Sequence, residues 1–422
     1  MISSFTLHDG TKVHLYNIDK FKTISIRFIF PGELNNDKYM AENVLASMLS
    51  KSNKEYKEEK DFVKYLRGLY KTSFSTYYSN HGSMALFNIG FSIINNKYID
   101  EDINLLEKAF DIANNVFTNA DLTIEKFEKE KRLHEEKYNG NLTKRSYAFR
   151  QFRKLMFDYK LEDPYRNKQE DIKKVTYEDI LNAYQNLFNR PCEILIVGDI
   201  TEEEIKSAYG NYLFNHGTKK PNLYYTHRYV DVKEPKIEIE STKSHQSHLC
   251  MGFRTNIFNS VKEKYAFTIL NYMLGGDSFS TLFQEIREKR SLAYNVSVSA
   301  DTSRTMFIYT AINSEDYEET VKVINDVLED YRNGNIDKEV FEMSKLALFD
   351  GTITEYDRIG YYSEFLFSTA INNGEQPISL EKRTEIAEKI TLEDISELCQ
   401  KIKLDTSYFL RGELWLKCII KL

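Results

Sequence analysis

The sequence predicts an α+β fold of two homologous domains, each a mainly antiparallel sheet with helices packed on one face. Three observations favour this class. Predicted strands come in groups between helices and do not alternate strictly with them. Only 6 prolines and 17 glycines occur in 422 residues, which favours long helices over an all-β fold built on tight turns. The order of elements in the first half also returns in the second half.

In the first half, apolar residues at helical spacing predict helices, and alternating apolar and polar residues predict strands. The predicted strands cover residues 11–18, 24–30, 74–78 and 84–93, and a buried strand over 193–200 closes the half. The predicted helices cover residues 38–51, 58–71, 103–117 and 175–188, together with a long charged helix that starts near Thr123.

The second half, from Lys236 on, repeats this order. Predicted strands over 237–241 and 248–253 precede a helix over 266–274. Further paired strands over 295–300 and 306–312 lead to an amphipathic helix over 318–331.

Aligned residues make the repeat explicit. The segment TNADLTIEKFEKEK matches RNGNIDKEVFEMSK, which places Lys131 on Lys345 at an offset of 214 residues. The segment VTYEDI matches ITLEDI, which places Asp179 on Asp394 at an offset of 215. Two nearly equal offsets indicate a tandem duplication. The predicted domains are residues 1–215 and 235–422, joined by a polar linker over 216–234.

Composition and charge exclude several classes. A net charge of −7 and a pI near 5.8 leave no strong basic surface for nucleic acid. No apolar run is long enough to span a membrane, and the amino terminus has no signal or transit peptide pattern. The four cysteines, Cys192, Cys250, Cys399 and Cys418, do not cluster, which fits a reducing compartment. We therefore expect a cytoplasmic protein.

The clearest functional signal runs from Leu274 to Tyr294, LGGDSFSTLFQEIREKRSLAY. A glycine pair, Gly275 and Gly276, opens an amphipathic run. Arg287 and Tyr294 follow, seven residues apart and thus close to two helical turns. If the helix continued to Tyr294, both side chains would point the same way; if it ended near Ser291, the tyrosine would be independent of it. In both cases a guanidinium and a phenol lie near each other.

This stretch resembles the insulinase and pitrilysin family of zinc metallopeptidases, which includes mitochondrial processing peptidase and has a sequence like LFQELREKRGLAY at this place. The resemblance implies a clamshell of paired domains, in which Gly275 and Gly276 face substrate and Arg287 and Tyr294 hold its backbone. It extends over nearly the whole chain because the family shares the duplication. A helix with a buried tyrosine and a solvated arginine is the alternative interpretation.

The family's zinc motif, His-x-x-Glu-His, is absent. The family's HFLEHML aligns with NVLASML here, so Asn43, Ala46 and Ser47 stand where the first histidine, the glutamate and the second histidine belong. Neither alanine nor serine can replace an imidazole ligand or a general base. No metal site is therefore expected in this chain.

Other histidines give weaker signals. His134 begins a stretch like the HExxH zinc helix, but Tyr138 stands where its second histidine belongs, so a solvated helix face is favoured. His245, His248 and Cys250 could be imagined as ligands, yet no third ligand shares a strand face with His248 and Cys250.

The resemblance therefore predicts a non-catalytic subunit of a heteromeric zinc metalloendopeptidase. Arg287 and Tyr294 would contribute to a peptide-cleaving chamber shared with a homologous subunit that bears an intact His-x-x-Glu-His motif and the zinc. The alternative is a structural or peptide-binding homologue with no role in catalysis. A self-sufficient peptidase with unrecognised ligands is a third possibility.

The tail from Glu413 to Leu422, ELWLKCIIKL, is a strongly apolar addition that holds the single tryptophan, Trp415. A fold back onto the core of the second domain is favoured over an edge strand or a partner contact.

Overall fold

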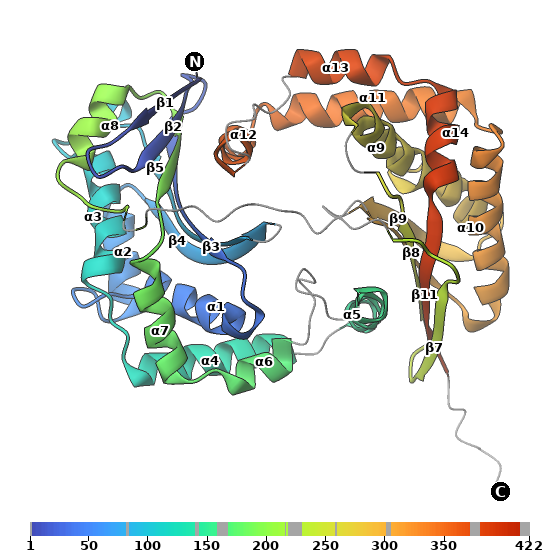
Figure 1. Cartoon of the computed structure of the whole chain (residues 1–422), viewed down its shortest axis with the longest axis horizontal. Helices are drawn as coiled ribbons and strands as arrows, with labels where there is room; N and C mark the ends of the chain where they lie inside the picture. The colour runs from blue at the N-terminus through green and yellow to red at the C-terminus, as the bar shows by residue number, and fades with distance from the viewer. Residues whose placement is uncertain are drawn as a thin grey trace, which may run out of the picture. The chain divides into compact units, whose positions relative to one another are not determined.

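The computed structural model describes residues 2–81, 84–139, 143–157, 168–215, 217, 230–257, 260–300, 305–371 and 380–413. The chain forms two compact units, each with its own sheet (Figure 1). Unit 1 consists of Met1–Gly140, Asn167–Tyr225 and Glu355–Pro377. Unit 2 consists of Asn141–Arg166, Thr226–Thr354 and Ile378–Leu422. Each half of the sequence thus supplies one segment to the unit that the other half builds.

The predicted division into 1–215, 216–234 and 235–422 describes the sequence repeat and stays a prediction. Most of the predicted linker, 216–229, and the tail beyond Glu413 lie outside the described residues, apart from residue 217.

Unit 1 is built on a six-stranded sheet with the strand order β1-β2-β6-β3-β5-β4. Strands β2 and β6 run parallel, and the other neighbours in this sheet are antiparallel. The strands are β1 (Ile2–Thr6), β2 (Lys12–Asn17), β3 (Thr23–Glu33), β4 (Ser73–His81), β5 (Met84–Ile94) and β6 (Glu193–Gly198).

The main core of unit 1 lies between this sheet and a layer of helices. Phe28 and Phe30 of β3 meet Phe110 and Phe117 of α3, with ring centroids 5.7 Å and 5.1 Å apart. The helices of this unit that belong to the first half are α1 (Asn36–Lys51), α2 (Glu59–Gly68), α3 (Leu105–Thr118), α4 (Ile124–Asn139), α6 (Lys168–Lys174), α7 (Tyr177–Leu187) and α8 (Glu202–Tyr209), with a short turn, η1 (Asn96–Tyr98).

Unit 2 is built on a five-stranded sheet with the order β7-β11-β8-β10-β9. Strands β7 and β11 run parallel, and the remaining neighbours are antiparallel. This is the order and direction of β2-β6-β3-β5-β4 in unit 1. The strands are β7 (Lys236–Thr242), β8 (Ser247–Arg254), β9 (Ala293–Ala300), β10 (Thr305–Ile312) and β11 (Lys403–Gly412).

Helices again cover one face of this sheet and enclose the main core of unit 2. Tyr317, at the start of α10, stacks on Phe409 of β11 with ring centroids 4.4 Å apart. The helices are α9 (Val261–Gly275), α10 (Tyr317–Arg332), α11 (Lys338–Glu355), α13 (Leu380–Glu388) and α14 (Leu392–Lys401), with two short elements, η2 (Phe283–Glu288) and η3 (Ser314–Asp316). The predicted α+β class is confirmed.

The opposite face of each sheet carries one helix from the other half of the sequence. In unit 1, α12 (Ile359–Ile371) buries Leu366 and Phe367 in a cluster with Leu195 and Val197 of β6. In unit 2, α5 (Lys144–Phe157) buries Phe152 and Met156 in a cluster with residues of β8, β10 and β11. The sequence pattern predicted helices on one face only, so this exchange of single helices is a new feature.

Equivalent residues of the two halves make equivalent contacts. The Lys131 side chain donates to the carbonyl oxygens of Lys173 and Val175, at 3.2 Å and 2.8 Å. The Lys345 side chain donates to those of Glu388 and Ile390, at 3.0 Å and 3.4 Å.

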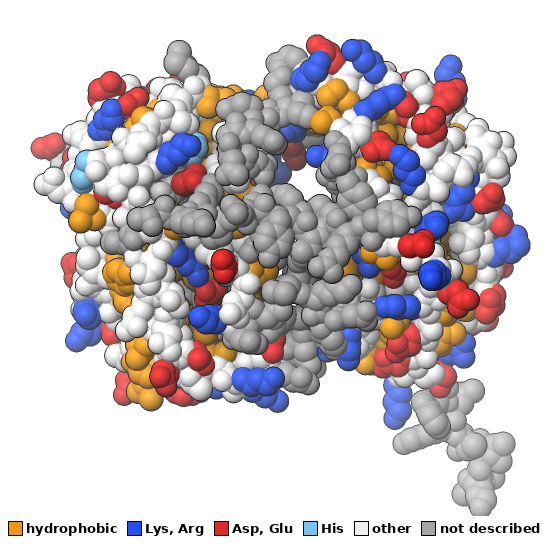
Figure 2. Space-filling model, viewed as in Figure 1, with side chains coloured by type: hydrophobic (Ala, Val, Ile, Leu, Met, Phe, Trp, Pro, Cys, Tyr) orange, Lys and Arg blue, Asp and Glu red, His pale blue; other side chains and the backbone are white. Residues whose placement is uncertain are grey.

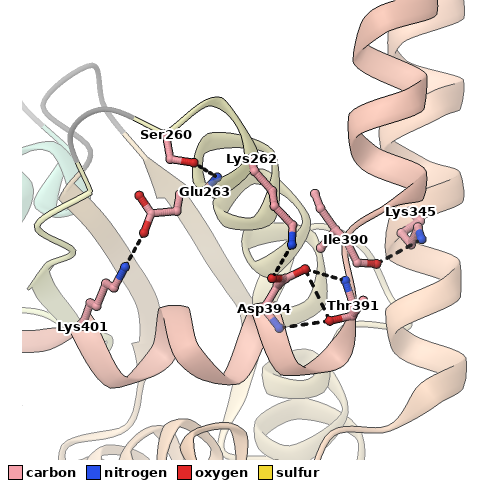
Figure 3. A network of polar contacts seen from close by, with 8 residues as sticks. All are labelled: Ser260, Lys262, Glu263, Lys345, Ile390, Thr391, Asp394 and Lys401. Carbon is pink, nitrogen blue, oxygen red and sulfur yellow. Dashed lines mark hydrogen bonds and ion pairs between the residues drawn. The ribbon is translucent and has the colours of Figure 1, made fainter.

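The helices that follow these carbonyls begin alike. Helices α7 and α14 both start with a capping box, Thr176 with Asp179 and Thr391 with Asp394. Figure 3 shows the second of these boxes, with Lys262 reaching Asp394 from α9 at 2.6 Å. Reciprocal side-chain bonds of this kind satisfy backbone groups at a helix start.

Basic and acidic side chains are interspersed over the face of the molecule in Figure 2. Within the described residues, no helix is long and apolar enough to cross a membrane.

Candidate functional site

The residues singled out in the sequence meet where α9, η2 and β9 follow one another in unit 2. Helix α9 ends at Gly275, and Gly276 caps it by donating its N–H to the carbonyl oxygen of Tyr272 at 3.2 Å. Residues 277–282 lead into η2, a single wide helical turn, and β9 begins at Ala293. This strand lies at the edge of the sheet, next to β10 alone.

Both glycines allow a close approach of backbone to a neighbour. A Cβ on Gly275 would lie 2.4 Å from Val298 Cγ2 of β9, and a Cβ on Gly276 would lie 2.6 Å from Tyr272 Cδ1. Neither distance is possible for real atoms, so packing alone requires glycine at both places. The predicted substrate-facing role of this pair remains a prediction.

Local hydrogen bonds fix the turn that follows the glycines. The Ser280 hydroxyl donates to the carbonyl oxygen of Asp277 at 2.6 Å, and the Gln284 side chain donates to that of Ser278 at 2.7 Å. Leu282 and Ile286 are fully buried and anchor η2 to the core. The turn that precedes Arg287 is therefore held rigidly.

The Arg287 guanidinium lies over two aromatic rings. It is 4.6 Å from the ring centroid of Phe283 and 4.9 Å from that of Tyr294. Its Nε atom lies 3.3 Å from a carboxylate oxygen of Glu288. Cation–π contacts of this kind hold the plane of a guanidinium while its edge stays accessible. The sequence pattern places Phe283 on an apolar face with Leu282 and Ile286, but it does not predict the contact of Phe283 with Arg287.

The helix does not persist to Tyr294. Its last residue is Glu288, and Ser291 adopts a left-handed backbone conformation with φ of 52°, which turns the chain into β9. The Tyr294 side chain is 79% exposed. The second of the two arrangements considered for this tyrosine is therefore the one observed.

The charged side chains close to Arg287 in the sequence form ion pairs with one another. Glu285 pairs with Lys289 at 2.5 Å and also with Arg290. Partial burial acts to raise the pKa of Glu285, but the hydrogen bonds from Lys289 and Arg290 outweigh it, and the net effect lowers that pKa. Glu285 is thus held as a carboxylate away from Arg287.

These contacts leave hydrogen-bond donors of Arg287 and Tyr294 available to a ligand. Among the described residues, neither the two terminal nitrogens of Arg287 nor the Tyr294 hydroxyl has a hydrogen-bond partner, whereas Arg190 and Arg254 pair with buried carboxylates. An oriented guanidinium and a phenol at the start of an edge strand suit carbonyl or carboxylate oxygens of a bound chain.

The residues at the zinc-motif positions lie on α1 in unit 1. Asn43 and Ser47 are half-buried, and Ala46 is buried with its carbonyl oxygen accepting from Thr76 at 2.5 Å. The Asn43 side chain donates to the carbonyl oxygen of Tyr39 at 2.7 Å within the same helix. The Asn43 side chain thus bonds within α1, and the Ala46 carbonyl oxygen bonds to β4.

His134 of α4 contacts this face of α1. Its Nε2 atom lies 2.9 Å from the Ser47 hydroxyl, and its ring is half-buried. The expectation that His134 lies on a solvated face is therefore wrong. The reason is that α4 packs against α1, a contact that the charged sequence of α4 does not predict.

Zinc does not fit this set of residues. One imidazole beside a hydroxyl, an amide and a methyl group lacks the three nitrogen or carboxylate ligands of a catalytic zinc site. Across the part of the chain that the structure describes, no group of three or more His, Cys, Asp or Glu side chains is arranged to hold a metal ion.

Comparisons with known proteins show which proteins this chain resembles. A family profile described as "Peptidase M16 inactive domain" matches residues 174–348. Over 417 residues the chain is 26% identical to a Bacillus subtilis protein described as "Probable inactive metalloprotease YmfF", with 96% of both chains covered. It is also 27% identical over 171 residues to an uncharacterized zinc protease of Mycobacterium bovis, covering 40% of this chain and 39% of that protein.

Among solved structures, a conserved protein from Enterococcus faecalis V583 superposes with a TM-score of 0.88. It is 24% identical in sequence, and the match covers 98% of this chain and 99% of that one. At this identity the likeness establishes the fold.

Proposed function

Because this chain is a homologue of the insulinase and pitrilysin (M16) family of zinc metallopeptidases, we propose that it is a non-catalytic subunit of a heteromeric zinc metalloendopeptidase. In this proposal, a homologous subunit with an intact His-x-x-Glu-His motif supplies the zinc. This chain supplies Arg287 and Tyr294 to a peptide-cleaving chamber that the two subunits share.

The proposal rests on a difference between two sites of this chain, the zinc-motif positions on α1 and the pair Arg287 and Tyr294. On α1, Ala46 and Ser47 offer a methyl group and a hydroxyl that bonds to His134, so a zinc-activated water has no support there. At η2 and β9, in contrast, the stacked Arg287 and the exposed Tyr294 keep their donor atoms available. The second site thus has groups that can bind a peptide, whereas the first lacks the ligands of a zinc site.

The role of each residue follows from its chemistry. Arg287 would donate hydrogen bonds from its terminal nitrogens to backbone carbonyl oxygens of the peptide. The Tyr294 hydroxyl would hold the scissile region or the oxyanion that develops during cleavage. Gly275 and Gly276 would let the peptide backbone approach the turn.

The alternative function is a structural or peptide-binding homologue without a role in catalysis. It is equally consistent with the lack of zinc ligands on α1. It differs in its expectation that a partner's peptidase rate does not depend on Arg287 or Tyr294.

The test is an activity assay on the assembled complex. The chain is combined with a homologous subunit that bears the intact zinc motif, and kcat/KM is measured on short unstructured peptides. Arg287→Ala and Tyr294→Phe should each lower kcat/KM more than tenfold, which corresponds to about 1.4 kcal/mol of transition-state stabilisation. Arg290→Ala is the matched control, since Arg290 lies on the same turn but pairs with Glu285.

An unchanged rate for both variants, with the complex still assembled, would favour the structural alternative. Analysis of bound metal in the purified chain addresses the third possibility, a self-sufficient peptidase. Zinc at one equivalent per chain, with activity in the absence of a partner, would contradict the proposal.

A further inference from the structure

The edge strand β7 of unit 2 carries two exposed isoleucines. Ile237 is 62% exposed and Ile239 is 45% exposed. Ile239 pairs with Phe409 of β11, whose ring is buried in the main core of unit 2. Side chains of paired residues in a sheet point to the same face. We call Ile237 and Ile239 the β7 patch, and it extends the apolar core surface to the edge of the sheet.

The next residue of β7, Glu240, points to the opposite face. The Glu240 carboxylate accepts a hydrogen bond from the Tyr147 hydroxyl of α5 at 2.7 Å and another from the Tyr408 hydroxyl. Helix α5 lies on the face opposite to the main core. Because successive residues of a strand alternate between faces, Ile237 and Ile239 point to the core side.

The corresponding strand of unit 1 has its core side covered. Strand β2 runs parallel to β6, as β7 does to β11. Its core-side residues Val13 and Leu15 are buried in a cluster that includes Ile205 and Tyr209 of α8. Helix α8 is the element that follows β6 in the chain. In unit 1, the residues that follow β6 thus cover the core side of β2, the parallel neighbour of β6.

In unit 2, the chain after β11 leaves the sheet at the position equivalent to that of the chain after β6 in unit 1. The Glu413 N–H donates to the carbonyl oxygen of Thr242, at the end of β7, at 2.9 Å. The Ser241 hydroxyl donates to the Glu413 carboxylate at 2.6 Å. Ser241 lies on the same face of β7 as Ile237 and Ile239. The chain therefore leaves β11 beside the end of β7, on the side of the β7 patch.

The residues that follow are suited to an apolar surface in both composition and reach. Residues 414–422, LWLKCIIKL, contain two lysines among otherwise apolar side chains. From Thr242 back to Ile237 the strand spans about 17 Å, at about 3.3 Å per residue. Nine residues reach about 30 Å when extended.

We propose that residues 414–422 cover the β7 patch of the same chain. They would do for β7 what α8 does for β2. Since β7 is an edge strand, they would also prevent pairing of this apolar edge with a strand of another molecule. The inference does not depend on the proposed role of Arg287 and Tyr294.

Trp415, the single tryptophan of the sequence, reports directly on this contact. In the full-length native chain we expect tryptophan emission at shorter wavelength, and weaker quenching by acrylamide, than in the chain unfolded in urea. The double variant Ile237→Asp/Ile239→Asp should shift both readings to those of the unfolded chain, with an unchanged far-UV circular dichroism spectrum. Leu346→Asp is the matched control, because Leu346 of α11 is similarly exposed in the same unit.

Cys418 provides a second probe. Cys192, Cys250 and Cys399 are buried, so a thiol reagent reports on Cys418 in the native protein. We expect slow labelling in the wild type and at least tenfold faster labelling in the double variant, with Cys418→Ser as the blank.

Three results would overturn the proposal. The first is native emission equal to that of the unfolded chain. The second is protected emission that the double variant does not change, which would mean that the tail covers another surface. The third is protection that appears only as protein concentration rises, which would assign the tail to a second copy of the chain.

Discussion

The Arg287 guanidinium lies over the Tyr294 ring, 4.9 Å from its centroid, although the helix that carries the arginine ends before the strand that carries the tyrosine. The contact is therefore made across a turn and does not follow from helical spacing. Phe283, 4.6 Å from the same guanidinium, is the additional residue that orients it.

Removing the Phe283 ring should weaken the action of Arg287. An exposed cation–π contact is worth about 0.5–1 kcal/mol, so Phe283→Leu should lower kcat/KM of the assembled complex about two- to fivefold. In an Arg287→Ala background the same substitution should have no further effect, because the contact is already lost. Equal effects of Phe283→Leu in both backgrounds would contradict a positioning role.

Gly275 should be intolerant of even the smallest side chain. Gly275→Ala places a Cβ 2.4 Å from Val298 Cγ2, and overpacking of this kind costs about 1–3 kcal/mol of unfolding free energy. Adding Val298→Ala should restore part of the loss. Urea denaturation measures each step. Gly360→Ala is the control, since a Cβ at Gly360 meets no atom within 4 Å, and it should not destabilise the protein.

The two equivalent lysines should contribute similar stability to their own units. Lys131→Met and Lys345→Met each remove two hydrogen bonds to backbone carbonyls, and we expect a loss of about 1 kcal/mol in each case. Lys129→Met, on the exposed face of α4, is the control and should be neutral. Thermal denaturation followed by circular dichroism measures the changes. A loss in one variant alone would show that the equivalent contacts are not energetically equivalent.

Much of this architecture could be predicted because the signals are local. Helical and alternating patterns identified most strands and helices, and the repeated Lys131 and Lys345 make the same contacts in both halves. The short edge strand β1 was missed because its five residues are only partly buried.

The exchange of α5 and α12 was missed for a different reason. An amphipathic helix shows that it has a buried face but not which sheet covers that face. Likewise, a charged helix such as α4 gives no indication that His134 points toward Ser47. Contacts between distant segments depend on topology, which periodicity does not encode.

Acidification should destabilise the protein in part through His248. Burial, and then the positive charges of Arg145 and Lys144, lower the pKa of His248 below 6.5. The folded state therefore binds this proton less readily than the unfolded state. Stability is retained above pH 6.5 and is lost as the pH falls from there toward the lowered pKa.

His248→Gln removes this titration and keeps a polar group near the Tyr309 hydroxyl, which lies 2.8 Å from His248 Nδ1. From about pH 7.5 to about pH 5.5, the unfolding free energy should fall less steeply in the variant than in the wild type. His81, whose pKa is also lowered chiefly by burial, stays in both proteins, so some acid sensitivity should remain. Parallel curves would exclude a contribution from His248.

The exchanged helices predict that each half of the sequence stabilises the sheet of the other half. Leu366 of α12 is fully buried in a cluster with Leu195 and Val197 of β6, and Met156 of α5 is buried in a cluster with Tyr408 and Leu410 of β11. Replacement of a buried Leu or Met by Ala costs about 2–5 kcal/mol. Because each cluster belongs to one unit, the cost should fall mainly on that unit.

Hydrogen exchange of backbone amides distinguishes the two units. Leu366→Ala should lower protection in β3 and β6 more than in β8 and β11, although Leu366 is encoded in the second half of the sequence. Met156→Ala should give the opposite pattern, so each variant serves as the control for the other. If Leu366→Ala instead lowered protection chiefly in β8 and β11, α12 would have to stabilise the sheet of its own half, contrary to its burial against β6.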